Sequence, residues 1–517
     1  MARNIITNND IGTIPTIPIF VGFTVNDQER PFTAAEMNNI ITKVFESSDS
    51  LNAYYREISY NQLELAQEGR WDMVLEHPPD HYSWGFVPGE FDSSKPKMLV
   101  SDVFQILLDG NLETQFQDRL VLVFINTSAP EIGGRGAMCL APGTTDYPHT
   151  APPSTPEFFV GHPPLTGPQF DTTRRIASFI DNNFTVVQYG TYRKSEFSNW
   201  NDQFVRGVCI FTRDTAQSCA AHDILHAVKR ISGEPATRDF PGRRARAVPC
   251  LYNLYQQGYW ITNQFHRGIY CAPYIGWWDN MGDHLHPQLP RDFFAGDPYG
   301  VCAFTKMKLD MIPPGYIGTA TAAHQPFRLV PLTVSTLPQQ SNGQPVLAVK
   351  VPLSEGKDTA EYLLVEYRRH ISGTVDGIRV DVCGLVGNCN DDPAKVNPPD
   401  SLVSDKGILV YHVNEEGSQF GGEPRDYNNT TTDPDFVQDF LIYLYTPSMI
   451  TETGAMDWSK RTPEALKAAG FKPGPGTGYV PTFRLLYPFV NPTMRIEITV
   501  TEISDNDIDI EVMRTNL

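Results

Sequence analysis

The chain has 517 residues and a formal net charge of -19, with 41% hydrophobic and 20% charged residues. This composition is typical of a globular protein with a sizeable core, and it argues against a disordered or fibrous chain. The acidic balance argues against nucleic acid as a partner, because binding to a phosphate backbone requires a basic face. No run of about 18 apolar residues occurs, so the sequence predicts no membrane span.

The N-terminus has a weak apolar stretch that prolines interrupt, and it lacks the charged region and cleavage site of a signal peptide. The localisation stays open on this basis: the protein remains in the cell, leaves by a route without a cleaved signal, or is given in its mature form. Eight cysteines permit disulfides without demonstrating them. Cys383 and Cys389, which enclose a short Gly/Asn loop, are the best candidates for a local pair.

The N-terminal third of the chain alternates strand and helix patterns. Residues 17–24 (IPIFVGFT) are short, apolar and flanked by turn formers, which predicts a buried strand. A helical pattern follows, and Thr33 with Glu36 predicts a capping box at its start. Residues 119–126 (RLVLVFIN) predict a second buried strand. This order indicates an α/β domain.

The middle of the chain combines loops with one helix. Residues 140–172 are rich in Pro, Thr and Gly and predict a long surface loop. Residues 214–231 (DTAQSCAAHDILHAVKRI) predict a helix, and residues 234–249 predict a Gly/Pro/Arg loop.

From about residue 326 onward the pattern changes to short alternating segments separated by turn signals, which predicts a β-sandwich. We therefore expect two domains, residues 1–325 and 326–517. The predicted strands have the sequences FRLVPLTV, PVLAVKVPL, EYLLVEYRR, GIRVDVCGL, GILVYHVNE, MRIEITVTEI and DIDIEVM.

The predicted helix carries His222-Asp223-Ile224-Leu225-His226. Residues four apart lie on one face of a helix, so the two imidazoles can converge on one Zn²⁺. In the common HExxH form of this motif, the Glu is the general base that acts on zinc-bound water. Here the shorter Asp223 occupies that position. The string alone is a weak signal, because two histidines four positions apart also occur by chance.

Further segments resemble motifs of the immune inhibitor A family of zinc metallopeptidases, in the same chain order. These segments are Asn52–Tyr60 (NAYYREISY), Pro249–Tyr252 (PCLY), Gly276–Gly282 (GWWDNMG), Phe304–Leu309 (FTKMKL), Glu361–Arg368 (EYLLVEYR) and Gly407–Asn414 (GILVYHVN). In the family a Gly follows the first segment, whereas this chain has Asn61.

The resemblance implies a zincin-like α/β catalytic domain followed by an all-β sandwich domain. It implies a secreted zinc endopeptidase acting on proteins or peptides, with His222 and His226 as metal ligands. Asp223 is then the general base, and Met281 forms the methionine turn beneath the metal. The sequence does not define the oligomeric state.

The chain departs from the family pattern in ways that leave two questions open. Cys250 replaces an Asp of the family motif, and a thiolate is a good zinc ligand, but a small buried hydrophobe is the competing interpretation. The other candidates for a third ligand are Asp239, His266, His284 and His286. Because a general base must reach its water, the shortened acid at position 223 supports a second hypothesis. Under that hypothesis the protein is a catalytically impaired or inactive homologue with a binding, structural or assembly role.

Two acidic clusters, residues 388–392 and 426–435, offer oxygen ligands that suit Ca²⁺. Neither has the spacing of an EF-hand, so solvated loops are the competing interpretation.

Overall fold

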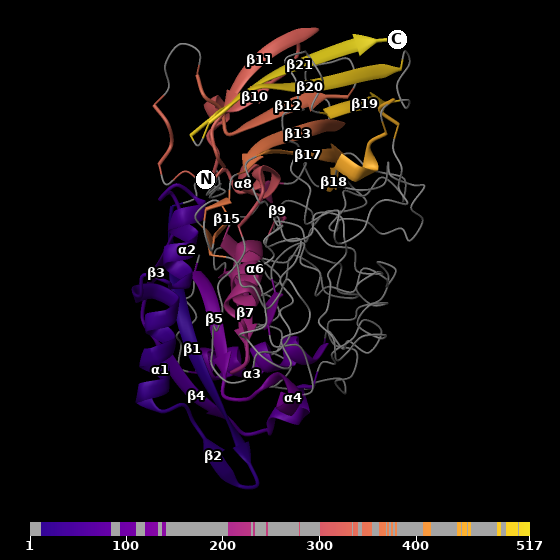
Figure 1. Cartoon of the computed structure of the whole chain (residues 1–517). Helices are drawn as coiled ribbons and strands as arrows, with labels where there is room; N and C mark the ends of the chain where they lie inside the picture. Colours follow the sequence, from indigo (N-terminus) through magenta and orange to yellow (C-terminus); the bar gives the residue numbers. More distant parts are fainter. Residues whose placement is uncertain are drawn as a thin grey trace, which may run out of the picture. The chain divides into compact units, whose positions relative to one another are not determined.

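A computed structural model describes part of the chain, and within these ranges the side chains of some helix and strand residues are not described. The described ranges are 12–83, 94–109, 119–132, 137–140, 205–228, 231–232, 245–246, 279, 300–332, 334, 336–339, 344–353, 361–368, 370–371, 374–375, 378–379, 407–414, 442–445, 447–451, 453–455, 483–487, 493–504 and 506–517. The protein is a mixed α/β fold in which sheets dominate (Figure 1).

The chain divides into two compact units. Unit 1 comprises Met1–Arg56, Gln62–Pro249 and Gln288–Gly296, and unit 2 comprises Glu57–Asn61, Cys250–Pro287 and Asp297–Leu517. The sequence predicts one domain boundary, near residue 325. In the structure, residues 297–325 belong to the same compact unit as the C-terminal strands. The assignment of a catalytic domain to residues 1–325 stays a prediction.

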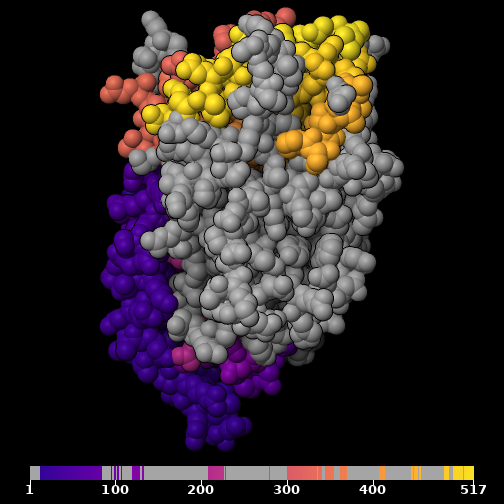
Figure 2. Space-filling view, viewed as in Figure 1, coloured from indigo at the N-terminus to yellow at the C-terminus, as the bar shows by residue number. Residues whose placement is uncertain are grey.

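Unit 1 contains a seven-stranded mixed sheet in the order β2-β1-β5-β7-β6, with β3 and β4 also paired to β1. β1, β5 and β7 run parallel, β3 and β4 are parallel to β1, and β2 and β6 are antiparallel to their neighbours. The strands are β1 (Thr13–Val25), β2 (Gln28–Arg30), β3 (Glu64–Gln67), β4 (Trp71–Leu75), β5 (Arg119–Ile125), β6 (Ala137–Leu140) and β7 (Val205–Phe211). β2 is exposed along its length, and the indigo N-terminal part of the chain can be followed at the surface in Figure 2.

Both faces of this sheet are covered, which explains why β1 and β5 are continuous apolar runs rather than alternating ones. On one face, Val121, Val123 and Ile210 share a hydrophobic cluster with side chains of α3 (Ser94–Asp109). On the other face, the rings of Phe20, Phe124 and Phe211 form a row with centroid separations of 5.3 and 5.7 Å.

The other helices in the described part of unit 1 are α1 (Ala34–Ile41), which continues into a π-helical turn (Thr42–Glu46), α2 (Leu51–Ile58), α4 (Ala129–Ile132) and α6 (Gln217–Val228). The last two residues of α2 are grouped with unit 2. The predicted capping box is confirmed, because the Thr33 hydroxyl accepts from the Glu36 N–H and the Glu36 carboxylate accepts from the Thr33 N–H. A 3₁₀ turn, η2 (Pro79–Tyr82), and a small β8–β9 pair (Ile231–Ser232, Ala245–Arg246) complete the described part of unit 1.

Unit 2 contains two larger sheets. One is five-stranded, in the order β10-β12-β13-β17-β18, and the other is a four-stranded antiparallel sheet in the order β11-β21-β20-β19. Their strands are β10 (Ile317–Thr319), β11 (His324–Leu329), β12 (Ala348–Pro352), β13 (Glu361–Arg368), β17 (Gly407–Asn414), β18 (Ile442–Tyr445), β19 (Phe483–Tyr487), β20 (Met494–Ile503) and β21 (Ile508–Asn516).

The two sheets share one hydrophobic core. Val365 on β13 and Val410 on β17 belong to the same buried cluster as Ile496 and Ile498 on β20 and Val512 on β21. Apolar residues alternate with half-buried ones along β19, β20 and β21, which is the pattern of strands with one covered face. Two sheets around a common core are consistent with the predicted β-sandwich.

The smaller elements of unit 2 are α8 (Ala303–Lys308), the 3₁₀ turns η7 (Pro314–Tyr316) and η10 (Pro447–Met449), and a three-stranded sheet of β14 (His370–Ile371), β15 (Thr374–Val375) and β16 (Ile378–Arg379). Within the described ranges, no helix combines the length and the apolar character needed to cross a membrane.

Candidate functional site

The HDxxH segment lies on a helix, as the sequence predicts. α6 extends from Gln217 to Val228, a few residues shorter than predicted at each end. His222 is 1% exposed and Asp223 is 6% exposed. His226 lies four positions further along the same helix, and its side chain is outside the described part. The helical backbone therefore gives the two histidines the spacing that shared metal binding requires.

Two side chains of unit 1 donate hydrogen bonds to backbone carbonyls of α6 on either side of His222. The buried Tyr55 hydroxyl donates a hydrogen bond of 2.9 Å to the carbonyl of Ala221. The buried Cys209 thiol on β7 donates a weak one of 3.5 Å to the carbonyl of Asp223. Tyr55 belongs to a segment that carries the family resemblance, but the sequence contains no signal that assigns it or Cys209 to this helix.

The position of α6 in unit 1 follows from a short connection. β7 ends at Phe211 and α6 begins at Gln217, and the helix packs against both β7 and β6 (Figure 1). β6 is the last strand of this sheet within the described residues. The helix with the two histidines therefore lies against the antiparallel edge of the sheet.

A complete set of metal ligands is not defined by the described residues. Among them, no group of three or more His, Cys, Asp and Glu side chains has the arrangement of a metal site. Cys250 and Met281 lie outside the described residues, as do both acidic clusters. The alternative ligands also lie outside them: Asp239, His266, His284 and His286. The third zinc ligand and the calcium sites stay predictions.

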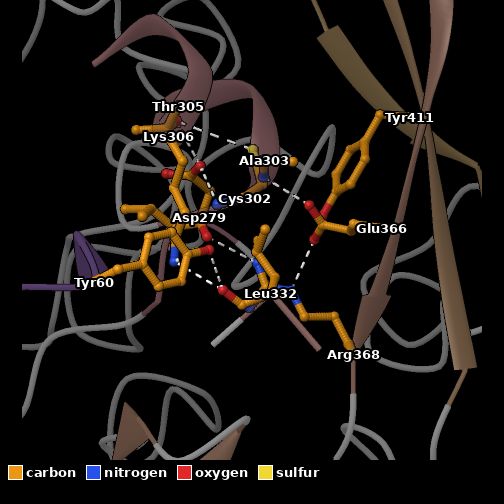
Figure 3. A network of polar contacts seen from close by, with 11 residues as sticks. Tyr60, Asp279, Cys302, Ala303, Thr305, Lys306, Leu332, Glu366, Arg368 and Tyr411 are labelled. Atoms are coloured by element: carbon orange, nitrogen blue, oxygen red, sulfur yellow. Dashed lines mark hydrogen bonds and ion pairs between the residues drawn. The ribbon is translucent and has the colours of Figure 1, made fainter. Parts of the chain in front are cut away.

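Unit 2 contains a buried polar network around α8 (Figure 3). Asp279 is fully buried, and its carboxylate accepts hydrogen bonds from the Cys302 N–H at 2.8 Å and the Thr305 hydroxyl at 2.6 Å. Asp279 thus satisfies donors in the first turn of α8, where a helix leaves its N–H groups without internal partners. Burial, and then the charges of Asp279 and Glu366, raise the pKa of the Cys302 thiol well above its ordinary value. Cys302 is therefore a structural rather than a reactive thiol.

Lys306 extends this network from the same helix. It is fully buried, and its ammonium donates to the Tyr60 hydroxyl at 3.1 Å and to the carbonyl of Leu332 at 3.0 Å. The ammonium also lies 4.2 Å from the centroid of the Tyr60 ring. Burial raises the pKa of Glu57, and the nearby charge of Lys306 opposes that rise.

Glu366 links α8 to the five-stranded sheet. Its fully buried carboxylate accepts from the Ala303 N–H at 2.7 Å, from the Arg368 guanidinium at 2.8 Å and from the Tyr411 hydroxyl at 2.9 Å. Arg368 also donates to the carbonyl of Val301 at 3.0 Å. Burial, followed by the Glu366 charge, raises the pKa of Tyr411 well above its usual value.

The network brings together residues from five of the six segments that carry the resemblance. Tyr60, Asp279, Lys306, Glu366 and Tyr411 each come from a different one of those segments, and in the fold they meet in unit 2. A buried charge without partners is costly, so each of these residues constrains the others. The network is a structural element that joins α8 to β13 and β17.

No protein-family model matches this chain, and no curated protein matches it either. Membership of the immune inhibitor A family therefore stays a prediction from the motif segments.

Proposed function

We propose that this protein is a zinc-dependent endopeptidase of the zincin-like class, with His222 and His226 as metal ligands on α6. The observation that carries the proposal is the helical backbone of the HDxxH segment, which sets the two histidines one turn apart. Two imidazoles are ligands that fit Zn²⁺, and the carboxylate next to the first of them is at the position of the general base in this motif.

The edge of the sheet beside α6 supports the proposal that the substrate is a polypeptide. An edge strand has a row of N–H and C=O groups that can pair with an extended peptide, which would add a strand to the sheet. β6 is such a strand within the described part, and α6 packs against it. A peptide paired with β6 would therefore lie close to the helix that carries His222.

His222 and His226 would hold the zinc, which would supply a Lewis acid for the scissile carbonyl and for the attacking water. Asp223 would accept the proton of the attacking water and pass it to the leaving amine. The hydrogen bonds from Tyr55 and Cys209 to the flanking carbonyls would keep His222 and Asp223 in a constant orientation while the proton moves. A β-sandwich in unit 2 completes the proposed two-part architecture.

Our second proposal is that this protein is a catalytically inactive relative of such peptidases. It would keep the fold for a binding, structural or assembly role. The specific observation in its favour is the acid at position 223, which is one methylene shorter than Glu and only 6% exposed. A short, buried acid has a limited reach toward a water molecule.

Metal analysis of the full chain, combined with a casein cleavage assay, tests both proposals. We expect one zinc per chain in the wild type, cleavage that a chelator abolishes, and loss of zinc in His222→Ala and in His226→Ala. His324→Ala is the matched control, because His324 is an exposed histidine of unit 2 that pairs with Glu511. Circular dichroism checks that each variant is folded.

Unchanged zinc content in folded His222→Ala would exclude the metal site. Bound zinc without chelator-sensitive cleavage would exclude the peptidase and support the inactive relative.

A further inference from the structure

Two cysteines lie directly opposite each other on the strands next to α6. In the antiparallel pair of β6 and β7, Cys139 is the register partner of Cys209, although the two are 70 positions apart in the sequence. The flanking register pairs are Met138 with Ile210 and Leu140 with Val208, so the pairing is regular on both sides.

The register also defines the face of the sheet to which this pair belongs. The Cys209 thiol points toward α6, because it donates to the carbonyl of Asp223. Directly opposite residues of an antiparallel pair belong to the same face of the sheet. The backbone therefore assigns position 139 to the face that α6 covers.

The spacing of such a pair suits a disulfide. Opposite residues in an antiparallel pair have Cα atoms about 4.5 Å or about 5.5 Å apart, depending on their hydrogen bonding. Both values lie within the range of about 4.4–6.8 Å that disulfides span. Cys209, Cys219 and Cys302 are in the thiol form in the structure.

We propose that Cys139 and Cys209 form a cross-strand disulfide when the protein meets a low-molecular-weight disulfide oxidant. The thiolate of one cysteine attacks a sulfur of the oxidant, which forms a mixed disulfide and releases one small thiol. The thiolate of the other cysteine then attacks the protein sulfur of the mixed disulfide, which forms the S–S bond and releases the second small thiol. The two cysteines lose two electrons and two protons, and the oxidant is reduced to two thiols.

The cross-link has two consequences for unit 1. It joins the edge strand β6 covalently to β7, and it removes the S–H donor from the carbonyl of Asp223. Because Cys209 is fully buried, oxidation requires a local opening, and β6, which is the last strand of its sheet within the described residues, is where we expect it. We therefore expect a slow reaction that makes β6 more resistant to opening.

Peptide mapping of the full chain tests this proposal without measuring zinc or peptidase activity. The reduced protein is incubated with oxidised glutathione, alkylated in denaturant and digested without reductant. We expect a linked peptide pair containing Cys139 and Cys209, and the loss of alkylation at both of these positions relative to the reduced sample. Cys139→Ala and Cys209→Ala should each remove the linked pair, whereas Cys219→Ala on α6 should retain it.

Three outcomes would overturn the proposal: a link from Cys209 to Cys219, a link from Cys139 to another cysteine, or glutathione adducts at both positions without a link. Because Cys139 is on the edge strand, Cys139→Ala still allows the test if Cys209→Ala does not fold. The cross-link and the zinc site can fail independently, since one is measured by mapping and the other by metal content.

Discussion

The hydroxyl of Tyr60 donates a 2.5 Å hydrogen bond to the carbonyl of Leu332, which is 272 positions away in the chain. The same hydroxyl accepts from the buried ammonium of Lys306. Tyr60 also has a φ of 57°, a left-handed conformation that an aromatic residue rarely adopts. The buried hydrogen bonds stabilise this segment against its backbone strain.

We expect Tyr60→Phe to lower the free energy of unfolding of unit 2 by about 1–3 kcal/mol, because Lys306 loses a buried partner while the ring remains. Urea unfolding monitored by circular dichroism measures the effect. Tyr316→Phe is the matched control, because it removes a half-buried hydroxyl that donates to the carbonyl of Pro338 at 2.7 Å. We expect it to cost less than about 1 kcal/mol. Equal losses in the two variants would contradict a special role for the Lys306 contact.

Asn61 has a φ of 62°, also in the left-handed region. Asn61→Gly should leave stability unchanged or raise it slightly, whereas Asn61→Val should lower it by about 1–2 kcal/mol, because a branched side chain clashes in this conformation. Thermal unfolding measures both variants. Asn39→Gly is the control. At this exposed helical position, Gly should lower the stability by a few tenths of a kcal/mol. A stabilising Asn61→Val would show that the left-handed turn does not form.

Asp223→Glu should raise the rate of chelator-sensitive casein cleavage, on the order of tenfold, because the longer acid reaches the water better. Asp223→Asn should lower the rate by about 100-fold or more, since the amide cannot accept the proton. Both variants should keep the zinc content of the wild type. A fall in rate with Glu would show that the site is built around the shorter acid.

Glu361, the first residue of β13, is hydrogen-bonded to His412 on β17 and accepts from the Tyr487 hydroxyl on β19 of the other large sheet. Burial alone would raise its pKa, but the hydrogen bond and charge of His412 and the hydrogen bond from Tyr487 outweigh burial and hold the pKa below 4.5. A lowered pKa contributes stability above the unfolded value that is lost as the pH falls through the folded value. We therefore expect unit 2 to lose stability as the pH decreases below about 4.5.

Glu361→Gln should make stability less dependent on pH in that range, as thermal unfolding between neutral and acidic pH would measure. Glu511→Gln is the control, since Glu511 contacts the exposed His324 at the surface. If the pH dependence is the same in Glu361→Gln as in the wild type, other carboxylates determine it.

Arg368 and Glu366 form a buried ion pair at 2.8 Å, with side chains 2% and 0% exposed. Arg368→Met should destabilise unit 2 by about 3–5 kcal/mol, because it leaves a carboxylate buried without its cation. Adding Glu366→Gln should recover part of this loss, which a double-mutant cycle in urea would measure. For comparison, Arg328→Met removes an exposed pair with Asp509 and should destabilise the unit much less, because solvent screens an exposed ion pair. Additive losses at 366 and 368 would contradict coupling within the pair.

The sequence by itself determined the elements that depend on local physics. The buried strands β1 and β5, the capping box of Thr33 and Glu36, the α6 helix and most strands of unit 2 follow from apolar periodicity and side-chain capping. These signals lie within about one helix or strand length, so the sequence alone contains them. The one-turn spacing of His222 and His226 is of the same kind.

Only the tertiary structure decided which distant residues meet. The contact of Tyr55 with α6, the register of Cys139 with Cys209, and the network of Asp279, Lys306 and Glu366 depend on strand pairing and packing across long stretches of chain. No local sequence pattern specifies these contacts, because the partner of a buried polar side chain depends on which distant segment the tertiary structure places next to it. The fold supplies the physical reason that these residues are buried together, and their assignment to a family pattern stays a prediction from the sequence.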